Sequence, residues 1–266
     1  MGRDTNVTRT PAEVYEEFFV PALFNDWAER VADAAGVAPG QRVLDVACGT
    51  GVLARAVARR VAPGGSVVGL DPNEDMLVVA QRKAPEIEWR QGRAEWLPFD
   101  DDSFDAVVCQ FGMMFFEDGE AAIREMMRVL RPGGQLTAAV WDELDNSPGY
   151  AALTRLLEKL FGARVAESMR APYVLSDARQ FRSLFLQAGN PNTRVETLPG
   201  TVHFPSIKAM IATERACVFT LGGLLDDAQF ELLQHEAETV MRPFVVADGS
   251  VQFAAPAHVA VATKVG

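Results

Sequence analysis

Short apolar segments alternate with segments of helical period between residues 40 and 145. In the longer segments, apolar side chains recur every three to four positions, and Gly- and Pro-rich sequences separate the two kinds of segment. The pattern predicts strands at residues 42–47, 66–71, 87–91, 104–110 and 135–141. Buried strands that alternate with amphipathic helices favour a parallel sheet covered on both faces, so the expected fold class is α/β.

This alternation is interrupted after residue 141, where longer helical segments begin. The expected elements are helices at 148–162 and 177–188, a strand within 193–204, a pair of helices within 206–244, and a last strand in the apolar run 258–265. Pro256 would lie just outside that last strand, because proline cannot donate a hydrogen bond to a neighbouring strand.

The N-terminal segment carries the signals of two covering helices. Thr10 and Pro11 are typical of a helix start, and Gly36 is typical of a helix end. Pro21 lacks a backbone N–H, so we expect it to break this helical stretch into two pieces.

A glycine-rich turn follows the first expected strand. Gly49, Gly51 and Ala54 have the spacing G-x-G-x-x-A, which permits positive φ angles and a close approach of a ligand to the backbone. The helix after the turn presents unpaired N–H groups and the positive end of its dipole. Because NAD and other nucleoside cofactors use the same device, the turn alone leaves the cofactor open.

Two carboxylates beside this turn narrow the choice of cofactor. Asp71 follows Gly51 by twenty residues and can accept both hydroxyl hydrogens of a ribose, which disfavours NADP. Asp45 precedes Gly49 by four residues, where it would repel a pyrophosphate and attract an ammonium group. S-adenosylmethionine carries an ammonium and a sulfonium and therefore fits better, with an NAD-dependent oxidoreductase as the alternative.

The composition restricts the partners and the compartment. Aspartate and glutamate number 36 against 25 lysines and arginines, and the net charge of −11 disfavours nucleic acid and anionic membranes as partners. Three cysteines without C-x-x-C spacing favour a reducing compartment. No apolar run approaches the roughly 18 residues of a membrane span, and the N-terminus lacks an apolar signal segment, so we expect a cytoplasmic protein. The sequence does not indicate the oligomeric state.

Four ordered motifs resemble those of class I S-adenosylmethionine-dependent methyltransferases. They are VLDVACGTG (43–51), VVGLDPNEDML (67–77), QGRAEWLPFDDDSFDAVVCQFGMMFF (91–116) and RVLRPGGQL (128–136). Their order is similar to that of the methyltransferase type 11 subgroup, which includes ubiquinone and menaquinone biosynthesis enzymes. The resemblance implies a Rossmann-like, doubly wound seven-stranded sheet, mostly parallel with an antiparallel last strand, and S-adenosyl-L-methionine as the cofactor with S-adenosyl-L-homocysteine as its product.

The resemblance also implies which residues hold the methionine part of the cofactor. Asp45 would neutralise the ammonium group, directly or through water, and Gln110 would offer it a carbonyl oxygen. Ala47, Gly49 and Gly51 would line the methionine with backbone atoms.

A second set of residues is implied for the adenosine part. Asp71 would hold the ribose hydroxyls, and the adenine would lie among Pro72, Met76, Ala94 and Glu95. The family usually has an aspartate at the position of Arg93, and arginine has no acceptor for the adenine amino group. We therefore expect backbone atoms near Ala94 to recognise the adenine.

The expected activity is transfer of a methyl group to a small, partly apolar molecule by in-line displacement at carbon. The cofactor supplies the electrophile and the leaving group, so the protein mainly aligns the acceptor and excludes water. The aromatic rings of Tyr15, Phe18 and Phe19 could roof such a site. The fourth expected strand is not followed by the Asn/Asp-Pro-Pro-aromatic tetrad of nucleic-acid amino-methyltransferases, which again favours a small acceptor.

No catalytic residue can be assigned from the sequence. His203 is the best placed of the three histidines to act as a base, although a structural role is favoured. No carboxylate–histidine cluster has the spacing of metal ligands, so no metal is expected. Because no base is evident, a non-catalytic S-adenosylmethionine-binding protein is a second alternative.

We expect six parts along the chain. They are N-terminal covering helices (1–39), a cofactor-binding Rossmann-like core (40–144), a helical insertion (145–175), a continuation of the core (176–204), a second helical insertion (205–248) and the last core strand (249–266). Helical insertions on the strand-end side of such a sheet commonly form a lid, and we expect that role for both insertions.

Overall fold

The structure is a computed structural model that describes residues 9–217 and 220–265. Residues 1–8, 218–219 and 266 belong to the expected parts 1–39, 205–248 and 249–266 and lie outside the described residues. The described elements are α1 (Pro11–Val14), η1 (Tyr15–Phe24), α2 (Asn25–Ala34), β1 (Arg42–Val46), α3 (Val52–Val61), β2 (Ser66–Asp71), α4 (Glu74–Lys83), β3 (Glu88–Gln91), β4 (Phe104–Gln110), η2 (Met113–Phe115), α5 (Gly119–Val129), β5 (Leu130–Trp141), η3 (Leu144–Asn146), α6 (Pro148–Phe161), α7 (Ala163–Arg170), η4 (Ala171–Tyr173), α8 (Ala178–Gln187), β6 (Arg194–Leu198), β7 (Thr201–Phe204), α9 (Ile207–Ala216), α10 (Asp227–Val240), η5 (Arg242–Phe244), β8 (Val251–Ala254) and β9 (Ala257–Thr263).

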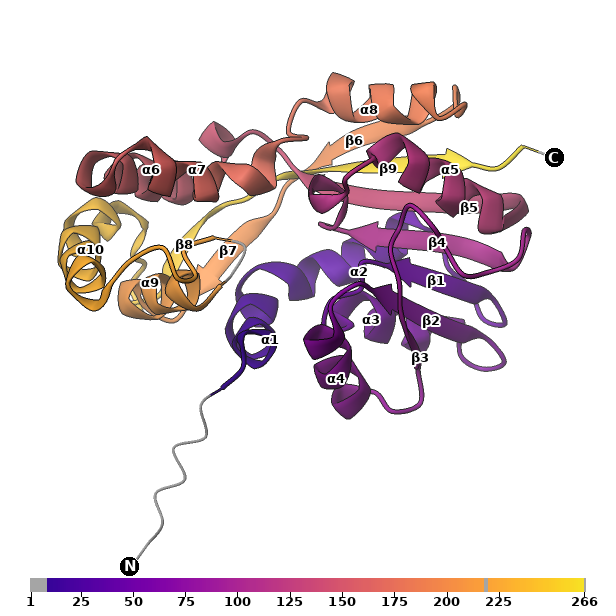
Figure 1. Ribbon diagram of the computed structural model, residues 1–266, viewed down its shortest axis with the longest axis horizontal. Coiled ribbons are helices and arrows are strands. Elements are labelled where there is room, and N and C mark those ends of the chain that lie inside the picture. The colour runs from indigo at the N-terminus through magenta and orange to yellow at the C-terminus, as the bar shows by residue number, and fades with distance from the viewer. Residues whose placement is uncertain (1–8, 218–219, 266) are drawn as a thin grey trace, which may run out of the picture.

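The main sheet has seven strands in the order β3-β2-β1-β4-β5-β9-β6 (Figure 1). The first five strands along the chain pair in parallel, and β9 runs antiparallel to both β5 and β6. Residues of β1, β4 and β5 are buried along most of their length, as expected for central strands that are covered on both faces. The predicted α/β class, doubly wound sheet and antiparallel last strand are confirmed.

Helices cover the two faces of this sheet. On one face, α2 and α3 pack together, with α2 against β4, β5 and β9 and α3 against β1 and β2. On the other face, α5 and α8 pack together, with α5 against β5 and α8 against β6 and β9 (Figure 1). The apolar side of α2 accounts for its position, because Trp27, Ala28, Val31 and Ala32 are all buried.

The N-terminal helix differs from the prediction at Pro21. Thr10 forms a capping box with Glu13, and Pro11 occupies the first helical position, as expected. The helix does not break at Pro21, however, because residues Tyr15–Phe24 continue it as a π-helix that contains this proline. The wider hydrogen-bond pattern of a π-helix accommodates Pro21, which has no N–H to donate, and the helix continues. The expectation of two separate pieces is wrong.

Three further details differ from the sequence pattern. β5 begins at Leu130 rather than at 135, because residues 131–134 join the strand through a shift in its pairing with β4 between Phe104 and Ala106. α7 is an additional helix in the first insertion. The expected strand within 193–204 is two strands, and the second of them, β7, pairs with β8 in a separate two-stranded sheet.

The helices of both insertions gather beyond one end of the main sheet. Figure 1 shows α6, α7, α9 and α10 together with β7 and β8 on the left of the view. α10 packs against both α6 and α9, so the two insertions form one continuous helical layer. α9 also contacts η1, which joins this layer to the N-terminal helix.

Candidate active site

One cavity of about 440 Å³ lies between the carboxyl ends of the parallel strands and the helical layer. The predicted residues that line it are Ala47, Gly49, Asp71, Pro72, Met76, Ala94, Glu95 and Gln110. Asp45 and Gly51, the other two predicted residues, are outside the lining formed by the described part of the chain. The carboxyl ends of neighbouring parallel strands meet at one edge of a sheet, which is why residues so far apart in sequence surround one space.

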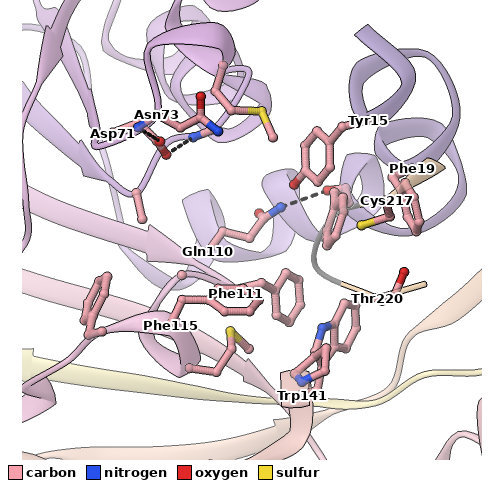
Figure 2. A pocket seen from close by; sticks show the side chains of 18 of the residues that line it. Tyr15, Phe19, Asp71, Asn73, Gln110, Phe111, Phe115, Trp141, Cys217 and Thr220 are labelled. Atoms are coloured by element: carbon pink, nitrogen blue, oxygen red, sulfur yellow. Dashed lines mark hydrogen bonds between the residues drawn. The ribbon is translucent and has the colours of Figure 1, made fainter. Parts of the chain in front are cut away.

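Asp71 anchors the glycine turn to the end of β2. The Gly49 N–H donates to Asp71 Oδ2 (2.8 Å), and the Asn73 N–H donates to Asp71 Oδ1 (2.9 Å). Figure 2 shows Asp71 and Asn73 together at one end of the pocket. Burial raises the pKa of Asp71, and the two amide hydrogen bonds partly offset that rise. Each carboxylate oxygen has a second lone pair, so Asp71 can accept ligand hydroxyls while it holds the turn.

The backbone around the turn adopts conformations that few residues favour. Gly49 and Gly51 have φ angles of 54° and 85°, and the non-glycine residues Ala47 and Phe111 have φ angles of 56° and 52°. Ala47 and Phe111 both line the cavity, at the ends of β1 and β4, and backbone strain of this kind concentrates at ligand sites. Gly51 has a second reason to be glycine, because a Cβ atom there would lie 2.3 Å from the ring of Trp89.

Asp45 is a buried carboxylate on β1 with an exposed fraction of 1%. Neither of its oxygens has a hydrogen-bond partner within residues 9–217 and 220–265. Burial raises the pKa of Asp45 well above its usual value. The nearby Ala54 N–H, which does not complete a hydrogen bond, lowers it in part, and the charge of Asp71 raises it further. An unpaired buried carboxylate is costly, so this position favours a ligand that supplies a positive charge, directly or through water.

Gln110 presents a second unsatisfied oxygen near the same strand ends. Its Nε2 donates to the carbonyl oxygen of Phe24 (3.1 Å), a bond drawn in Figure 2. Its Oε1 is buried and lacks a hydrogen-bond partner among the residues that the structure describes. Asp45 pairs with Val108, two residues before Gln110 on the adjacent strand. The ends of β1 and β4 therefore offer oxygen acceptors to a cationic group.

Arg93 lies at the rim of the cavity, in an ion-pair network. Its guanidinium pairs with Glu117 (2.8 Å) and Glu95 (3.5 Å), and the Glu117 N–H donates to Glu95 Oε1 (2.9 Å). Ala94, between them, is buried and lines the cavity. This arrangement orients the Arg93 side chain toward the two carboxylates. Recognition of an adenine by backbone atoms near Ala94 stays a prediction.

Aromatic rings line the middle of the cavity. Phe111 and Trp141 stack with their centroids 3.7 Å apart and their planes 9° from parallel. The rings of Tyr15 and Phe24 stack at 5.3 Å. Figure 2 shows Tyr15 on the side of the pocket opposite Phe111 and Trp141. Such a lining suits a flat apolar ligand.

The N-terminal helix contributes only part of the expected aromatic roof. Tyr15 and Phe19 line the cavity, as predicted. Phe18 is outside this lining of described residues, and its ring packs under the guanidinium of Arg9 instead, 5.6 Å from the ring centroid. The expectation for Phe18 is wrong because its side chain leaves the helix on another face.

Three ionisable side chains with oxygen atoms, which no sequence motif indicated, line the end of the cavity below the insertions. They are Tyr150 of α6, Tyr173 of η4 and Glu214 of α9. Burial raises the pKa of each, in the case of Glu214 to about 7. One signal could have identified Glu214, because it lies three and seven residues after Ile211 and Ile207 on the apolar side of its helix.

The three histidines are not placed as bases at this site. His203 on β7 and His235 on α10 are exposed, and neither belongs to the described lining of the cavity. His258 on β9 is buried, with Nδ1 2.8 Å from Thr197 Oγ1 and Nε2 2.7 Å from the carbonyl oxygen of Ser176. His258 therefore serves to connect β9, β6 and the segment before α8.

The described residues contain no group of three or more histidine, cysteine, aspartate or glutamate side chains arranged to hold a metal ion. None of the described helices combines the length and the apolar character required to cross a membrane.

Comparisons with known proteins indicate one family. Residues 19–202 match the ubiE/COQ5 methyltransferase family. A demethylmenaquinone methyltransferase of Staphylococcus carnosus is 34% identical over 194 residues, which cover 66% of this chain and 78% of that enzyme. A demethylmenaquinone methyltransferase of Renibacterium salmoninarum is 40% identical over 146 residues, which cover 55% of this chain and 60% of that enzyme.

Solved structures agree at the level of the fold. A SAM-dependent methyltransferase from Aquifex aeolicus has a TM-score of 0.52 at 18% identity, covering 71% of this chain and 91% of that one. Phosphoethanolamine N-methyltransferase 2 of Haemonchus contortus, in complex with phosphomonomethylethanolamine and S-adenosylhomocysteine, has a TM-score of 0.60 at 17% identity, covering 96% of this chain and 57% of that one.

Proposed function

The chain belongs to the ubiE/COQ5 methyltransferase family and is an S-adenosylmethionine-dependent methyltransferase, and from this premise we propose that its methyl acceptor is a reduced quinone. Membership of the family decides against the NAD-dependent oxidoreductase that the glycine turn alone allowed. It also decides against a non-catalytic binding protein.

We assign the cofactor to the end of the cavity nearest the glycine turn. Gln110 lines the cavity and offers Oε1 to its ammonium group, and Asp45, behind this lining, acts on the same group through water. Both present buried oxygens that no described residue satisfies. Asp71 accepts the ribose hydroxyls. The remaining predicted residues provide backbone and packing around the methionine and the adenine, namely Ala47, Gly49, Gly51, Pro72, Met76, Ala94 and Glu95. The unsatisfied carboxylate of Asp45 beside the turn is the observation that carries this assignment.

The acceptor is assigned to the aromatic part of the same cavity. The curated relatives act on demethylmenaquinone, by their names, and the stacked rings of Phe111 and Trp141 suit a flat ring system. An oxidised quinone is electron-poor and does not attack an electrophilic methyl group. Its reduced form has electron-donating hydroxyls and does, so the hydroquinone is the proposed substrate.

The residues of this chain position and shield the reactants. When bound, the cofactor supplies an electrophilic methyl group and a thioether leaving group. Tyr15, Phe111 and Trp141 hold the acceptor ring by packing, and the two insertions, 145–175 and 205–248, act as a lid that excludes water. Correct alignment of two bound reactants supplies several kcal/mol of the barrier reduction, so such positioning suits an enzyme without a metal.

The other assignments concern partners and location. The acidic composition supports a small-molecule acceptor rather than nucleic acid. The cytoplasmic location suggested by the cysteine content stays a prediction.

Methyl transfer to defined acceptors tests the proposed substrate class. We expect the purified chain to transfer tritium from methyl-labelled S-adenosylmethionine to a short-tailed demethylmenaquinone kept reduced by dithionite. The oxidised form of the same molecule is the matched control and should accept at least tenfold less label. Transfer to phosphoethanolamine, with none to the reduced quinone, would contradict the proposed substrate.

A further inference from the structure

Glu214 and Tyr150 place two unsatisfied polar groups at one end of the cavity. Both side chains line the cavity, and their exposed fractions are 1% and 5%. In the part of the chain that the structure describes, neither oxygen of the Glu214 carboxylate has a hydrogen-bond partner, and the Tyr150 hydroxyl has none either. One helix from each insertion supplies one of these groups, α6 for Tyr150 and α9 for Glu214.

No nearby cation in the described structure explains the buried charge of Glu214. The one cationic side chain in the described lining is Arg93, which pairs with two carboxylates at the rim. Arg215, next to Glu214 in the chain, pairs with Asp227 at the surface. A buried carboxylate that serves only structure normally accepts complete hydrogen bonds. The Thr220 and Tyr150 hydroxyls lie close enough to lower the pKa of Glu214, yet among the described residues neither completes a hydrogen bond to a carboxylate oxygen, so these acceptor positions remain open for a ligand.

We propose that Glu214 is a catalytic residue that accepts the hydroxyl proton of the methyl acceptor, while Tyr150 donates a hydrogen bond to the same acceptor oxygen. This proposal rests on the proposed function. It assigns the hydroxyl of the reduced quinone to the end of the cavity between α6 and α9.

The proton transfer balances with the methyl transfer. The O–H bond of the acceptor breaks, its proton moves to the Glu214 carboxylate, and the electron pair stays on the acceptor. That pair forms the new bond to the methyl carbon, from the oxygen or, through conjugation, from a ring carbon. The bond between methyl carbon and sulfur breaks at the same time, and its electron pair stays on the sulfur as the thioether. A ring carbon methylated in this way then loses its own hydrogen as a proton to water, and the electron pair of that bond restores the aromatic ring.

The surroundings of Glu214 suit it to this exchange. Burial raises its pKa to about 7, while the Thr220 and Tyr150 hydroxyls oppose that rise. The other titratable groups at this end of the cavity are Tyr173 of η4 and Cys217, which follows α9. Burial and, after it, the charge of Glu214 raise the pKa of Tyr150, which keeps that phenol protonated and able to donate. A base with a pKa near the working pH is the most effective in general base catalysis.

The pair of groups favours a hydroxyl over an amine as the ligand. A hydroxyl has one proton for Glu214 and lone pairs for the Tyr150 proton, so it satisfies both side chains. An amine must be neutral to attack a methyl group, and its single lone pair forms the new bond, so no lone pair is left to accept the Tyr150 proton. The experiment must therefore distinguish methylation of an amine from methylation of a hydroxyl-bearing acceptor.

Glu214→Gln is the decisive variant, because glutamine keeps the shape of the side chain and cannot accept the proton. We expect kcat with the reduced short-tailed demethylmenaquinone to fall by at least about 100-fold, which is within the usual contribution of a general base. Binding of S-adenosylhomocysteine should change by less than threefold. Glu231→Gln, an exposed glutamate on α10, is the matched control and should keep the wild-type rate.

The pH profile separates catalysis from a structural role. The wild-type kcat should rise tenfold per pH unit below about 7 and then level off, because Glu214 must be deprotonated to act. In Glu214→Gln this limb should disappear. The variant should also unfold at an equal or higher temperature than wild type at pH 8, since it removes a buried charge. A Glu214→Gln enzyme with the wild-type rate and pH limb would overturn the proposal, as would full activity toward an amine acceptor.

A failure of the proposed function can be distinguished from a failure of this inference. If the wild-type chain methylates neither the reduced quinone nor phosphoethanolamine, the proposed function fails, and infrared difference spectra of wild type against Glu214→Gln still test the carboxyl group. A protonated carboxyl band that disappears between pH 6 and 8 supports the assigned proton acceptor. A band that persists above pH 9, or that is absent at pH 5, would overturn it.

Discussion

Replacing Asp71 with alanine is expected to weaken the binding of S-adenosylhomocysteine by at least 100-fold. In the proposed complex the Asp71 carboxylate accepts two ribose hydroxyls, and hydrogen bonds to a charged group contribute about 1.5–3 kcal/mol each. Two such bonds amount to about 3 kcal/mol or more, which corresponds to more than 100-fold in affinity. The substitution also removes the acceptor of the Gly49 and Asn73 amides, so the glycine turn should loosen. Calorimetric titration measures the affinity.

Two further variants separate these contributions. Asp71→Asn keeps one oxygen acceptor and should bind with intermediate affinity. Asp75→Ala removes an exposed carboxylate from the start of α4, the helix that follows Asp71, and it should bind like wild type. Equal affinity of Asp71→Ala and wild type would show that the ribose is held elsewhere.

Replacing Asp45 with asparagine is expected to act in opposite directions on binding and on stability. Removing one partner of a buried charge pair costs about 3–5 kcal/mol, so the affinity for the cofactor product should fall by 100-fold or more. The free protein should become more stable at pH 8, because a neutral amide replaces a buried carboxylate that has no partner within the described residues. Titration and thermal unfolding of the same samples measure both effects.

The raised pKa of Asp45 also predicts the direction in which the free energy of unfolding changes with pH. Burial raises the pKa of folded Asp45, so the folded chain retains a proton that the unfolded chain releases above its carboxyl pKa of about 4. The wild-type free energy of unfolding should therefore fall as pH rises from about 4 through the raised pKa, and this fall should be smaller in Asp45→Asn. Asp105→Asn is a control at the opposite end of the sheet, where Oδ2 accepts the Arg42 N–H (2.7 Å). It should lose stability and keep cofactor affinity, and a reversed pattern between the two variants would contradict the role of Asp45.

Much of the core and of the cofactor end could be predicted because the signals are local. Each strand is a short apolar run, and Asp45, Asp71 and Gln110 each lie in or at the end of such a run. The carboxyl ends of parallel strands meet at one edge, so spacing along the chain translates directly into position. The expected helix break at Pro21 was wrong, because a π-helix depends on a backbone hydrogen-bond pattern that no residue type predicts.

The acceptor end could not be predicted because its residues come from distant elements. Tyr150, Tyr173 and Glu214 meet only when the two insertions pack on each other, and helix packing is decided by contacts between many side chains. His203 illustrates the same limit. Its position near the end of an expected strand suggested a base. That strand, β7, pairs with β8 outside the main sheet, and His203 is exposed there.

Calorimetric titration of the wild-type chain with S-adenosylhomocysteine and, separately, with NAD tests most directly whether the glycine turn with Asp45 and Asp71 holds the methyl donor. We predict saturable one-to-one binding of S-adenosylhomocysteine and no binding of NAD. Saturable binding of NAD with none of S-adenosylhomocysteine would contradict the assigned site.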